Sequence, residues 1–123
     1  NLQGVVGGVG LSDMAYSPGA EFLAAAGGGA VRVVDPPTLD DVYSLSRPGG
    51  VLPFSVAFSP DNAFLAVGWS DGWVRLYWAQ TGSLMHEWPA HPGVIERLAF
   101  TRDGRLLASL GAEGTVHIWG VAE

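Results

Sequence analysis

The sequence predicts an all-β fold made of three copies of a small four-stranded antiparallel sheet. Three observations lead to this prediction. Short blocks of sequence recur at a fixed interval, glycine-containing turns separate short apolar segments, and no segment keeps a convincing helical period. The 123 residues include 18 glycines and 8 prolines, spread along the chain without a triplet period, which indicates frequent turns.

The repeat is clearest in a block that contains a serine or threonine. Ala15-Tyr16-Ser17-Pro18 recurs as Ala57-Phe58-Ser59-Pro60 and again as Ala99-Phe100-Thr101-Arg102. Both intervals between the Ser/Thr positions are 42 residues long. A second block, Phe22-Leu23-Ala24 in the first copy, keeps the same spacing, and a valine-rich block follows it. A fixed period of this length is the signature of a repeat architecture.

Each copy contains the apolar segments and turns of four short strands. Glycine supplies positive φ at the tight turn between the second and third strands, at Gly28-Gly29, Asp71-Gly72 and Glu113-Gly114. The predicted strands are Asp13–Tyr16, Phe22–Ala26, Val31–Val34 and Val42–Leu45, then Ser55–Phe58, Phe64–Gly68, Val74–Tyr77 and Leu84–Trp88, then Arg97–Phe100, Leu106–Leu110 and Thr115–Trp119. Leu2–Val6 occupies the place of a further outer strand at the start.

The inner strands are apolar on both faces instead of alternating between apolar and polar residues. Ala24-Ala25-Ala26 and Phe64-Leu65-Ala66-Val67 show this pattern. A sheet with two apolar faces needs a neighbour on each face, and sheets stacked as blades around an axis provide both. The sequence therefore predicts a β-propeller segment over residues 1–123, with approximate repeats at 1–41, 42–83 and 84–123.

Three blades do not close a ring, because propellers have about 4–8 blades. The predicted segment is therefore a partial ring that is completed by further blades or by other subunits. We favour further blades from a longer chain, since the sequence does not begin with Met. Leu2–Val6 precedes any inner strand and Thr115–Trp119 has no outer strand after it, so a ring could close by pairing the outer strand of one end with the blade of the other.

The third copy carries the motif that points to a family. His91, Ser109, Gly114 and His117-Ile118-Trp119 follow one another at the spacing of the WD40 repeat, and on these residues the chain resembles the WD40-repeat β-propeller family. The resemblance covers nearly the whole chain in three repeats. It implies a structural hydrogen-bond network of His91, Ser109 and Trp119, with Glu113 where aspartate is usual.

The first two copies keep little of this network. The second copy retains Asp71 but has Val67 and Tyr77 at the serine and tryptophan positions, and the first copy retains almost nothing. We therefore expect apolar packing to hold these two blades together.

Composition excludes several classes of function. The chain has no cysteine, which rules out disulfides, a thiol nucleophile and a cysteine metal site. A net charge of −6 with only 6 Lys+Arg disfavours binding to nucleic acid and to anionic membranes. The longest apolar run, Phe22–Val31, is too short to span a bilayer, and no signal peptide is recognisable. A cytoplasmic location, including a cytoskeletal or ciliary assembly, fits these features.

No constellation of residues predicts catalysis, a metal site or a cofactor. His86, His91 and His117 fall on different predicted elements, so they do not converge as zinc ligands do. Asp40-Asp41 lies in a predicted solvated turn, and Gly27-Gly28-Gly29 lacks the Lys-Ser/Thr of a phosphate-binding loop. The sequence therefore predicts no catalytic residue, and the chain is not expected to be an enzyme.

The resemblance also implies a docking surface for other proteins. In WD40 rings the turn at Asp71-Gly72 shares one face with the loops that lead into the first strands, here Arg47–Leu52 and His91–Val94. Tryptophan is enriched in the energetic centres of interfaces. The residues expected to contact a protein partner are Trp69, Ser70, Asp71, Arg47 and Pro92.

Three classes of function are open to a chain with these features. The favoured one is a non-catalytic protein-protein interaction scaffold, within a larger propeller or a multi-protein assembly. The alternative is an architectural component buried permanently in a large ciliary, coat or regulatory complex. A propeller enzyme is disfavoured, because the first strands that would line the axis carry only Asp13, Glu96 and Arg97 as charged groups.

Overall fold

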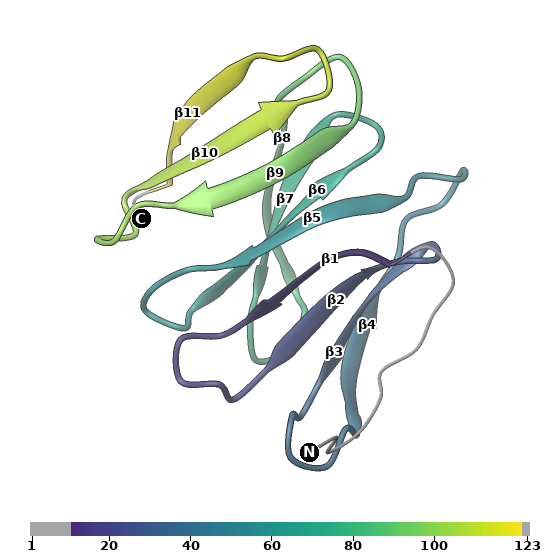
Figure 1. The fold of residues 1–123 in the computed structure, drawn as a ribbon, viewed down its shortest axis with the longest axis vertical. Coiled ribbons are helices and arrows are strands. Elements are labelled where there is room, and N and C mark those ends of the chain that lie inside the picture. Colours follow the sequence, from purple (N-terminus) through teal and green to yellow (C-terminus); the bar gives the residue numbers. More distant parts are fainter. Residues whose placement is uncertain (1–10, 122–123) are drawn as a thin grey trace.

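A computed structural model describes residues 11–121, and within that range every regular element is a β-strand (Figure 1). The strands form three separate antiparallel sheets. The first sheet has the order β1 (Leu11–Tyr16), β2 (Leu23–Gly27), β3 (Ala30–Val34) and β4 (Asp41–Leu45). The second has β5 (Pro53–Phe58), β6 (Phe64–Trp69), β7 (Trp73–Trp78) and β8 (Leu84–Pro89). The third has β9 (Ile95–Phe100), β10 (Leu106–Gly111) and β11 (Val116–Gly120).

The predicted all-β architecture of repeated blades is confirmed. Each sheet is displaced by one strand from the sequence repeats expected at 1–41, 42–83 and 84–123, because the fourth strand closes the sheet that precedes it. Within residues 11–121 the third sheet has no fourth strand. The outer strand predicted at Leu2–Val6 lies outside the described residues.

The recurring Ser/Thr residue has a structural role in each sheet. Its hydroxyl oxygen accepts the backbone N–H that follows the first turn, at 3.0 Å from Phe22 to Ser17, 2.9 Å from Phe64 to Ser59 and 3.2 Å from Leu106 to Thr101. The turn also needs a residue with positive φ, and Ala20, Asn62 and Gly104 fill that position. The 42-residue repeat is therefore the repeat of one turn geometry.

The second sheet is apolar on both faces because it lies between the other two. Leu65 and Val67 of β6 belong to the core shared with the first sheet. Ala66 of the same strand belongs to the core shared with the third sheet, together with Ile95 and Leu107. Full burial of a Leu, Ile or Val side chain contributes about 1.5–3 kcal/mol, so these two cores supply most of the attraction between blades.

The first strands of the sheets lie side by side and are joined by polar contacts. Figure 1 shows β1, β5 and β9 in succession, with each sheet extending outward from them. The carboxylate of Asp13 accepts the N–H of Val56 at 3.1 Å, and the hydroxyl of Ser55 donates to the carbonyl of Ile95 at 3.0 Å. These bonds set the spacing between neighbouring blades.

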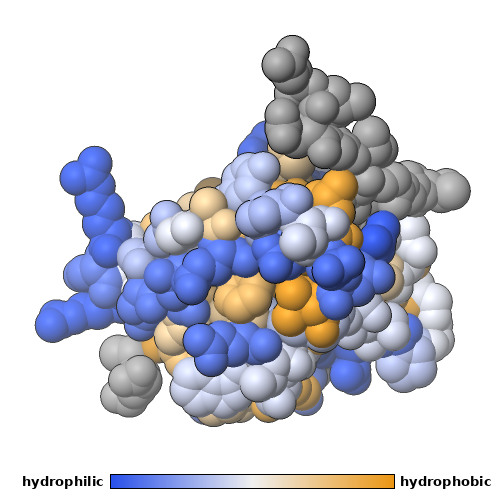
Figure 2. Space-filling view, turned by 90° about the horizontal axis from the view of Figure 1, so that it is seen from below, coloured by the Kyte–Doolittle hydropathy of each residue, from blue (hydrophilic) through white to orange (hydrophobic). Residues whose placement is uncertain are grey.

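Apolar side chains remain exposed on the two terminal sheets. Met14 and Tyr16 of β1 are 70% and 60% exposed, and Val116 and Ile118 are 55% and 61% exposed. On the face seen in Figure 2, hydrophilic residues surround smaller apolar patches. These four side chains therefore lie on the two terminal sheets, each of which has a neighbouring blade on one side only among the described residues.

Candidate functional site

The four residues predicted to form a network in the third sheet are brought together. The Nε2 of His91 lies 2.8 Å from the hydroxyl of Ser109, and its Nδ1 lies 2.7 Å from the carboxylate of Glu113. Trp119 Nε1 donates to the same hydroxyl at 2.9 Å. A neutral imidazole with its proton on Nδ1 satisfies every group, because Ser109 accepts from Trp119 and donates to His91 while His91 donates to Glu113.

Glu113 fits where an aspartate is usual because Gly111, which lies against its carboxylate, has no side chain. A Cβ atom on Gly111 would lie 2.0 Å from the Oε1 of Glu113. The hydrogen bond from His91 lowers the pKa of the Glu113 carboxyl below its usual range. The network therefore links the loop before β9 to β10, β11 and the turn between them.

His117 reinforces the same loop from a second strand. Its ring stacks on that of His91, with 4.5 Å between the centroids, and its Nδ1 lies 2.9 Å from the carbonyl oxygen of Ala90. The two histidines thus hold a loop and do not face a common point as metal ligands would. Within residues 11–121 no group of three or more His, Cys, Asp or Glu side chains is arranged to hold a metal ion.

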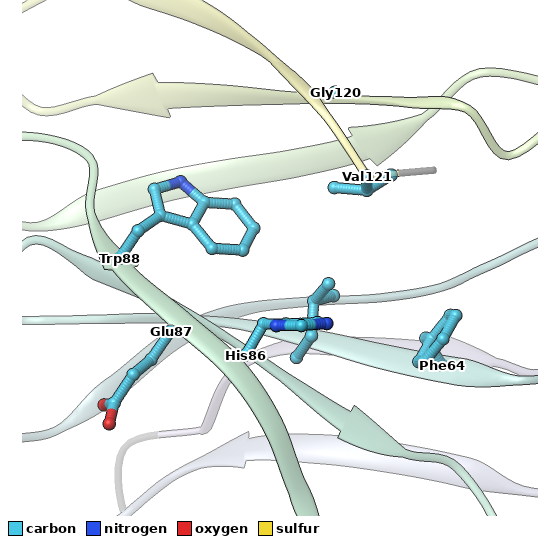
Figure 3. A pocket seen from close by; sticks show the side chains of 7 residues that line it. Phe64, His86, Glu87, Trp88, Gly120 and Val121 are labelled. Atoms are coloured by element: carbon cyan, nitrogen blue, oxygen red, sulfur yellow. The ribbon is translucent and has the colours of Figure 1, made fainter. Parts of the chain in front are cut away.

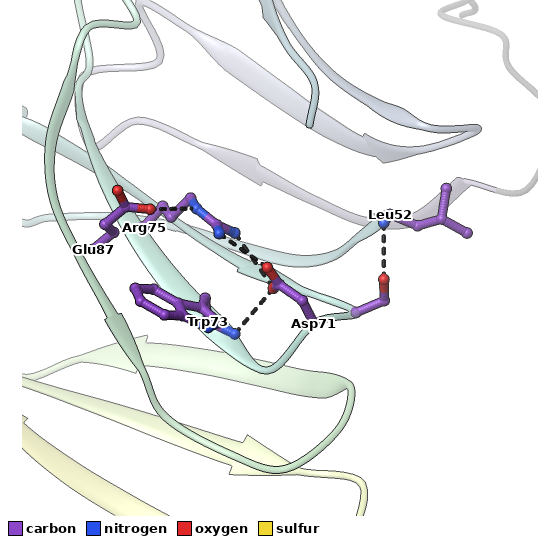
Figure 4. A network of polar contacts seen from close by, with 6 residues as sticks. Leu52, Asp71, Trp73, Arg75 and Glu87 are labelled. Atoms are coloured by element: carbon purple, nitrogen blue, oxygen red, sulfur yellow. Dashed lines mark hydrogen bonds and ion pairs between the residues drawn. The ribbon is translucent and has the colours of Figure 1, made fainter. Parts of the chain in front are cut away.

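The second sheet replaces this network by an ion-pair cluster around Arg75. Arg75 is 5% exposed, and it donates to Asp71 at 2.9 Å and to Glu87 at 2.8 Å (Figure 4). Its guanidinium lies 5.9 Å from the ring centre of Trp69 and 5.5 Å from that of Trp73. Burial alone would lower the pKa of Arg75, but the hydrogen bonds to Asp71 and Glu87 outweigh burial and raise it.

The prediction that Trp69 contacts a protein partner is wrong for this structure. Its side chain is 0% exposed and belongs to the core between the first two sheets. Trp69 occupies the position 42 residues before Gly111, and the loop 46–52 contains no histidine like His91. The indole instead lies beneath Arg75, where it packs against the cation and the apolar core.

The other residues predicted to bind a partner lie on loops at one end of the second and third sheets. Three of them are half-buried, namely Arg47, Ser70 and Asp71, whereas Pro92 is exposed. We call the surface of residues 46–52, 70–72 and 90–94 the loop face. Leu52, which is 43% exposed, is the largest exposed apolar side chain on it and was not singled out from the sequence.

Hydrogen bonds between the segments fix the loop face. Ser70 donates its N–H to the carbonyl of Leu52 at 2.7 Å. The N–H of Leu52 donates to the Ser70 hydroxyl at 2.9 Å, the bond drawn at Leu52 in Figure 4. The carbonyl of Gly72 accepts the N–H groups of both Ala90 and His91, at 2.7 and 3.0 Å. A Cβ on Gly72 would lie 1.8 Å from the carbonyl oxygen of His91, so only glycine allows this approach.

A cavity of about 260 Å³ opens at the outer rim between the second and third sheets (Figure 3). His86, Glu87 and Trp88 of β8 line one side, and Gly120 and Val121 line the other. The Glu87 carboxylate turns away from the other labelled side chains in Figure 3 and pairs with Arg75. Within the described residues, the Glu87 carboxylate is thus engaged by Arg75 and not by His86.

The stacked antiparallel sheets and the loop network define a segment of a β-propeller with a polar cluster in each of two blades. The chain belongs to the WD40-repeat family. The family described as "Anaphase-promoting complex subunit 4 WD40 domain" matches residues 14–99, and "WD domain, G-beta repeat" matches residues 82–120. Proteins of this family are generally interaction scaffolds without enzymatic activity.

The chain is also similar in sequence and in structure to individual known proteins. The chain is 28% identical over 109 residues to the human serine-threonine kinase receptor-associated protein, covering 89% of this chain and 31% of that protein. It is 31% identical to the Dictyostelium discoideum protein of the same name, covering 89% and 36%. The solved structure of U3-55K superposes with a TM-score of 0.84 at 19% identity, over 91% of this chain and 36% of that one. The chain thus spans about a third of the length of these relatives.

No helix within residues 11–121 has the length and apolar character needed to cross a membrane.

Proposed function

We propose that this chain is a non-catalytic scaffold that docks other proteins through the loop face. The observation that carries the proposal is the exposed Leu52, which two hydrogen bonds to Ser70 hold in place on a surface of three linked segments. A surface that is already ordered loses little conformational entropy when a partner binds. The net charge of −6 favours a protein partner over nucleic acid.

The names of the relatives support the same proposal. One matching family is a WD40 domain of a subunit of the anaphase-promoting complex, and several matching proteins are named serine-threonine kinase receptor-associated protein. Both descriptions concern association with other proteins. We infer the same kind of role for this chain, with a partner of its own.

A pair of matched substitutions tests the loop face. Leu52 and Leu84 are 43% and 42% exposed, but Leu84 lies at the start of β8 and outside the loop face. In the full-length protein, Leu52→Asp should weaken partner binding about fivefold or more, as expected for the centre of an interface. Leu84→Asp should leave it unchanged. Quantitative co-purification with both variants measures the difference, and equal retention of partners would remove the loop face from the proposal.

A second role, as an architectural component, is favoured by the exposed terminal sheets. Val116 and Ile118 on one sheet and Met14 and Tyr16 on another are more than half exposed. We propose that these faces pack against further blades, from the same chain or from another subunit. Val116→Lys with Ile118→Lys should then destabilise the full-length protein, and equal thermal stability of the variant would contradict this packing.

A further inference from the structure

A second pocket lies at the opposite end of the second sheet from the loop face. It has a volume of about 480 Å³ and is lined by Asp61, Asn62, Ala63, Trp78, Gln80 and Thr81. The first three residues belong to the turn between β5 and β6, and the others belong to the end of β7 and the turn that follows. We call it the Trp78 pocket. None of its lining residues is basic.

The indole of Trp78 presents one open aromatic face in this pocket. Phe64 stacks on the indole with 5.0 Å between ring centroids and 21° between the planes. Trp78 is nevertheless 41% exposed, although it ends a strand whose preceding residues are buried. One face of the ring is therefore supported by Phe64 while the rest is open to a ligand.

Only one carboxylate oxygen of Asp61 takes part in the hydrogen bonds of the turn. Its Oδ1 accepts the hydroxyl of Ser59 at 2.5 Å and the N–H of Ala63 at 3.0 Å. Within residues 11–121 no donor is bonded to its Oδ2. The hydrogen bond from Ser59 is the main cause of a lowered pKa for Asp61, so the carboxyl is ionised at neutral pH.

Asn62 adds an acceptor without a donor. Its Oδ1 is buried and has no hydrogen-bond partner among the described residues. Leaving such an atom unpaired is unfavourable, because the atom has lost its hydrogen bonds to water. Asn62 lines the pocket, so a ligand there that carries several N–H groups would offer this oxygen a donor.

The other two sheets form without the residues that line the Trp78 pocket, so the fold does not require them. The position of Trp78 is held by Asp35 in the first sheet and by Gly120 in the third. The position of Asn62 is held by Ala20 and Gly104, which adopt the same positive φ. All three sheets form, yet only the second combines an indole, a carboxylate and an amide at this end.

We propose that the Trp78 pocket binds the guanidinium group of an arginine side chain from a partner protein. A guanidinium is planar, stacks on an indole, and carries five N–H donors that suit a carboxylate and an amide oxygen together. An ammonium group cannot stack in this way. The inference rests on the proposed protein-binding function but not on the loop face, which lies at the other end of the sheet.

A capped Gly-Arg-Gly peptide is the probe, and the same peptide with citrulline in place of arginine is the control. Citrulline keeps the shape of the arginine side chain and removes its charge. Titration of the full-length protein is followed by the NMR signal of the Trp78 indole N–H. The arginine peptide should give a saturable shift, and the citrulline peptide should bind about tenfold more weakly, as expected for the loss of a charge-assisted hydrogen bond.

The chain offers a matched control for the carboxylate. Asp103 sits in the same turn of the third sheet, where it accepts the hydroxyl of Thr101 at 2.7 Å and the N–H of Arg105 at 3.0 Å. Its sheet has Gly120 in place of Trp78. Asp61→Asn should weaken the arginine peptide about tenfold, whereas Asp103→Asn should leave its binding unchanged.

Three results would overturn the proposal: no saturable shift, equal binding of the citrulline peptide, or equal effects of the two Asp→Asn variants. Trp78→Phe can keep the stack on Phe64 but has no indole N–H, so its peptide binding is measured beside the wild type by isothermal titration calorimetry. It should bind the peptide more weakly while keeping the thermal midpoint, so that loss of binding is not confused with unfolding. Leu52→Asp should not affect peptide binding, so a failed loop face and a failed Trp78 pocket give different results.

Discussion

A Cβ atom on Gly111 would lie 2.5 Å from the Nδ1 of His91. This relationship explains why the two networks of the chain differ. In the third sheet a glycine on β10 leaves room for the loop histidine and for Glu113. In the second sheet the same strand position carries Trp69, no loop histidine is present, and Arg75 becomes the centre of the polar cluster.

Gly111→Ala should therefore disrupt the His91 network of the third sheet. The methyl group would have to displace His91, Glu113 or the backbone, and overpacking of this kind costs about 1–3 kcal/mol. The free energy of unfolding from urea titration measures the loss. Gly93→Ala is the control, because a Cβ there meets nothing within 4 Å. Equal stability of the two variants would show that the His91 network tolerates the added group.

Trp69→Ala should act on stability before it acts on binding. The indole is fully buried, and removal of a buried aromatic side chain costs about 3–5 kcal/mol. Trp78→Ala removes the same side chain from a site that is 41% exposed and should cost clearly less. Urea unfolding of both variants gives the comparison, and a Trp69→Ala protein with wild-type stability would contradict the burial of this residue.

Arg75→Ala should destabilise the protein more than Arg32→Ala. Arg75 is 6% exposed in its side chain and pairs with two carboxylates, so its removal leaves Asp71 and Glu87 close together without their cation. Because those carboxylates keep partial solvent contact, we expect a cost of about 2 kcal/mol. The pair of Arg32 with Asp41 is 38% and 62% exposed, and it should contribute about 0–1 kcal/mol. Thermal unfolding of both variants would reveal any reversal of this order.

The bond between His91 and Glu113 should become weaker in acid. Its effect is to lower the pKa of Glu113 in the folded state from the ordinary value of 4.5, so the carboxylate stabilises the fold above that pH. This contribution is lost as the pH falls through the lowered value. The stability difference between the wild type and Glu113→Gln should therefore be constant above pH 4.5 and shrink below it. A difference that grows in acid would contradict the assigned bond.

Local sequence patterns were sufficient to predict the fold. The turn at Ser17, Ser59 and Thr101 depends on residues within five positions of one another, so its chemistry is visible in the repeat. The hydrogen-bond network of the third sheet was also predictable, because resemblance to the WD40 repeat supplied the partners that spacing alone does not.

The Arg75 cluster and the Trp78 pocket could not be predicted in the same way. Glu87 reaches Arg75 only through the pairing of β7 with β8, and Asp61 reaches the Trp78 pocket from a different turn. Neither of these two contacts can be predicted from the neighbouring residues in the sequence. The predicted exposure of Trp69 was wrong for a related reason, because the burial of its side chain depends on the sheet that packs against it and on the loop 46–52.

Strand positions, turn types and the need for neighbouring blades follow from the order of residues along the chain, because each depends on backbone geometry and on the spacing of apolar groups. Which tryptophan is buried, which carboxylate meets which cation and which aromatic face stays open depend on side chains that meet across turns and between sheets. Those contacts join residues far apart in sequence, so they exist only after the blades have packed together.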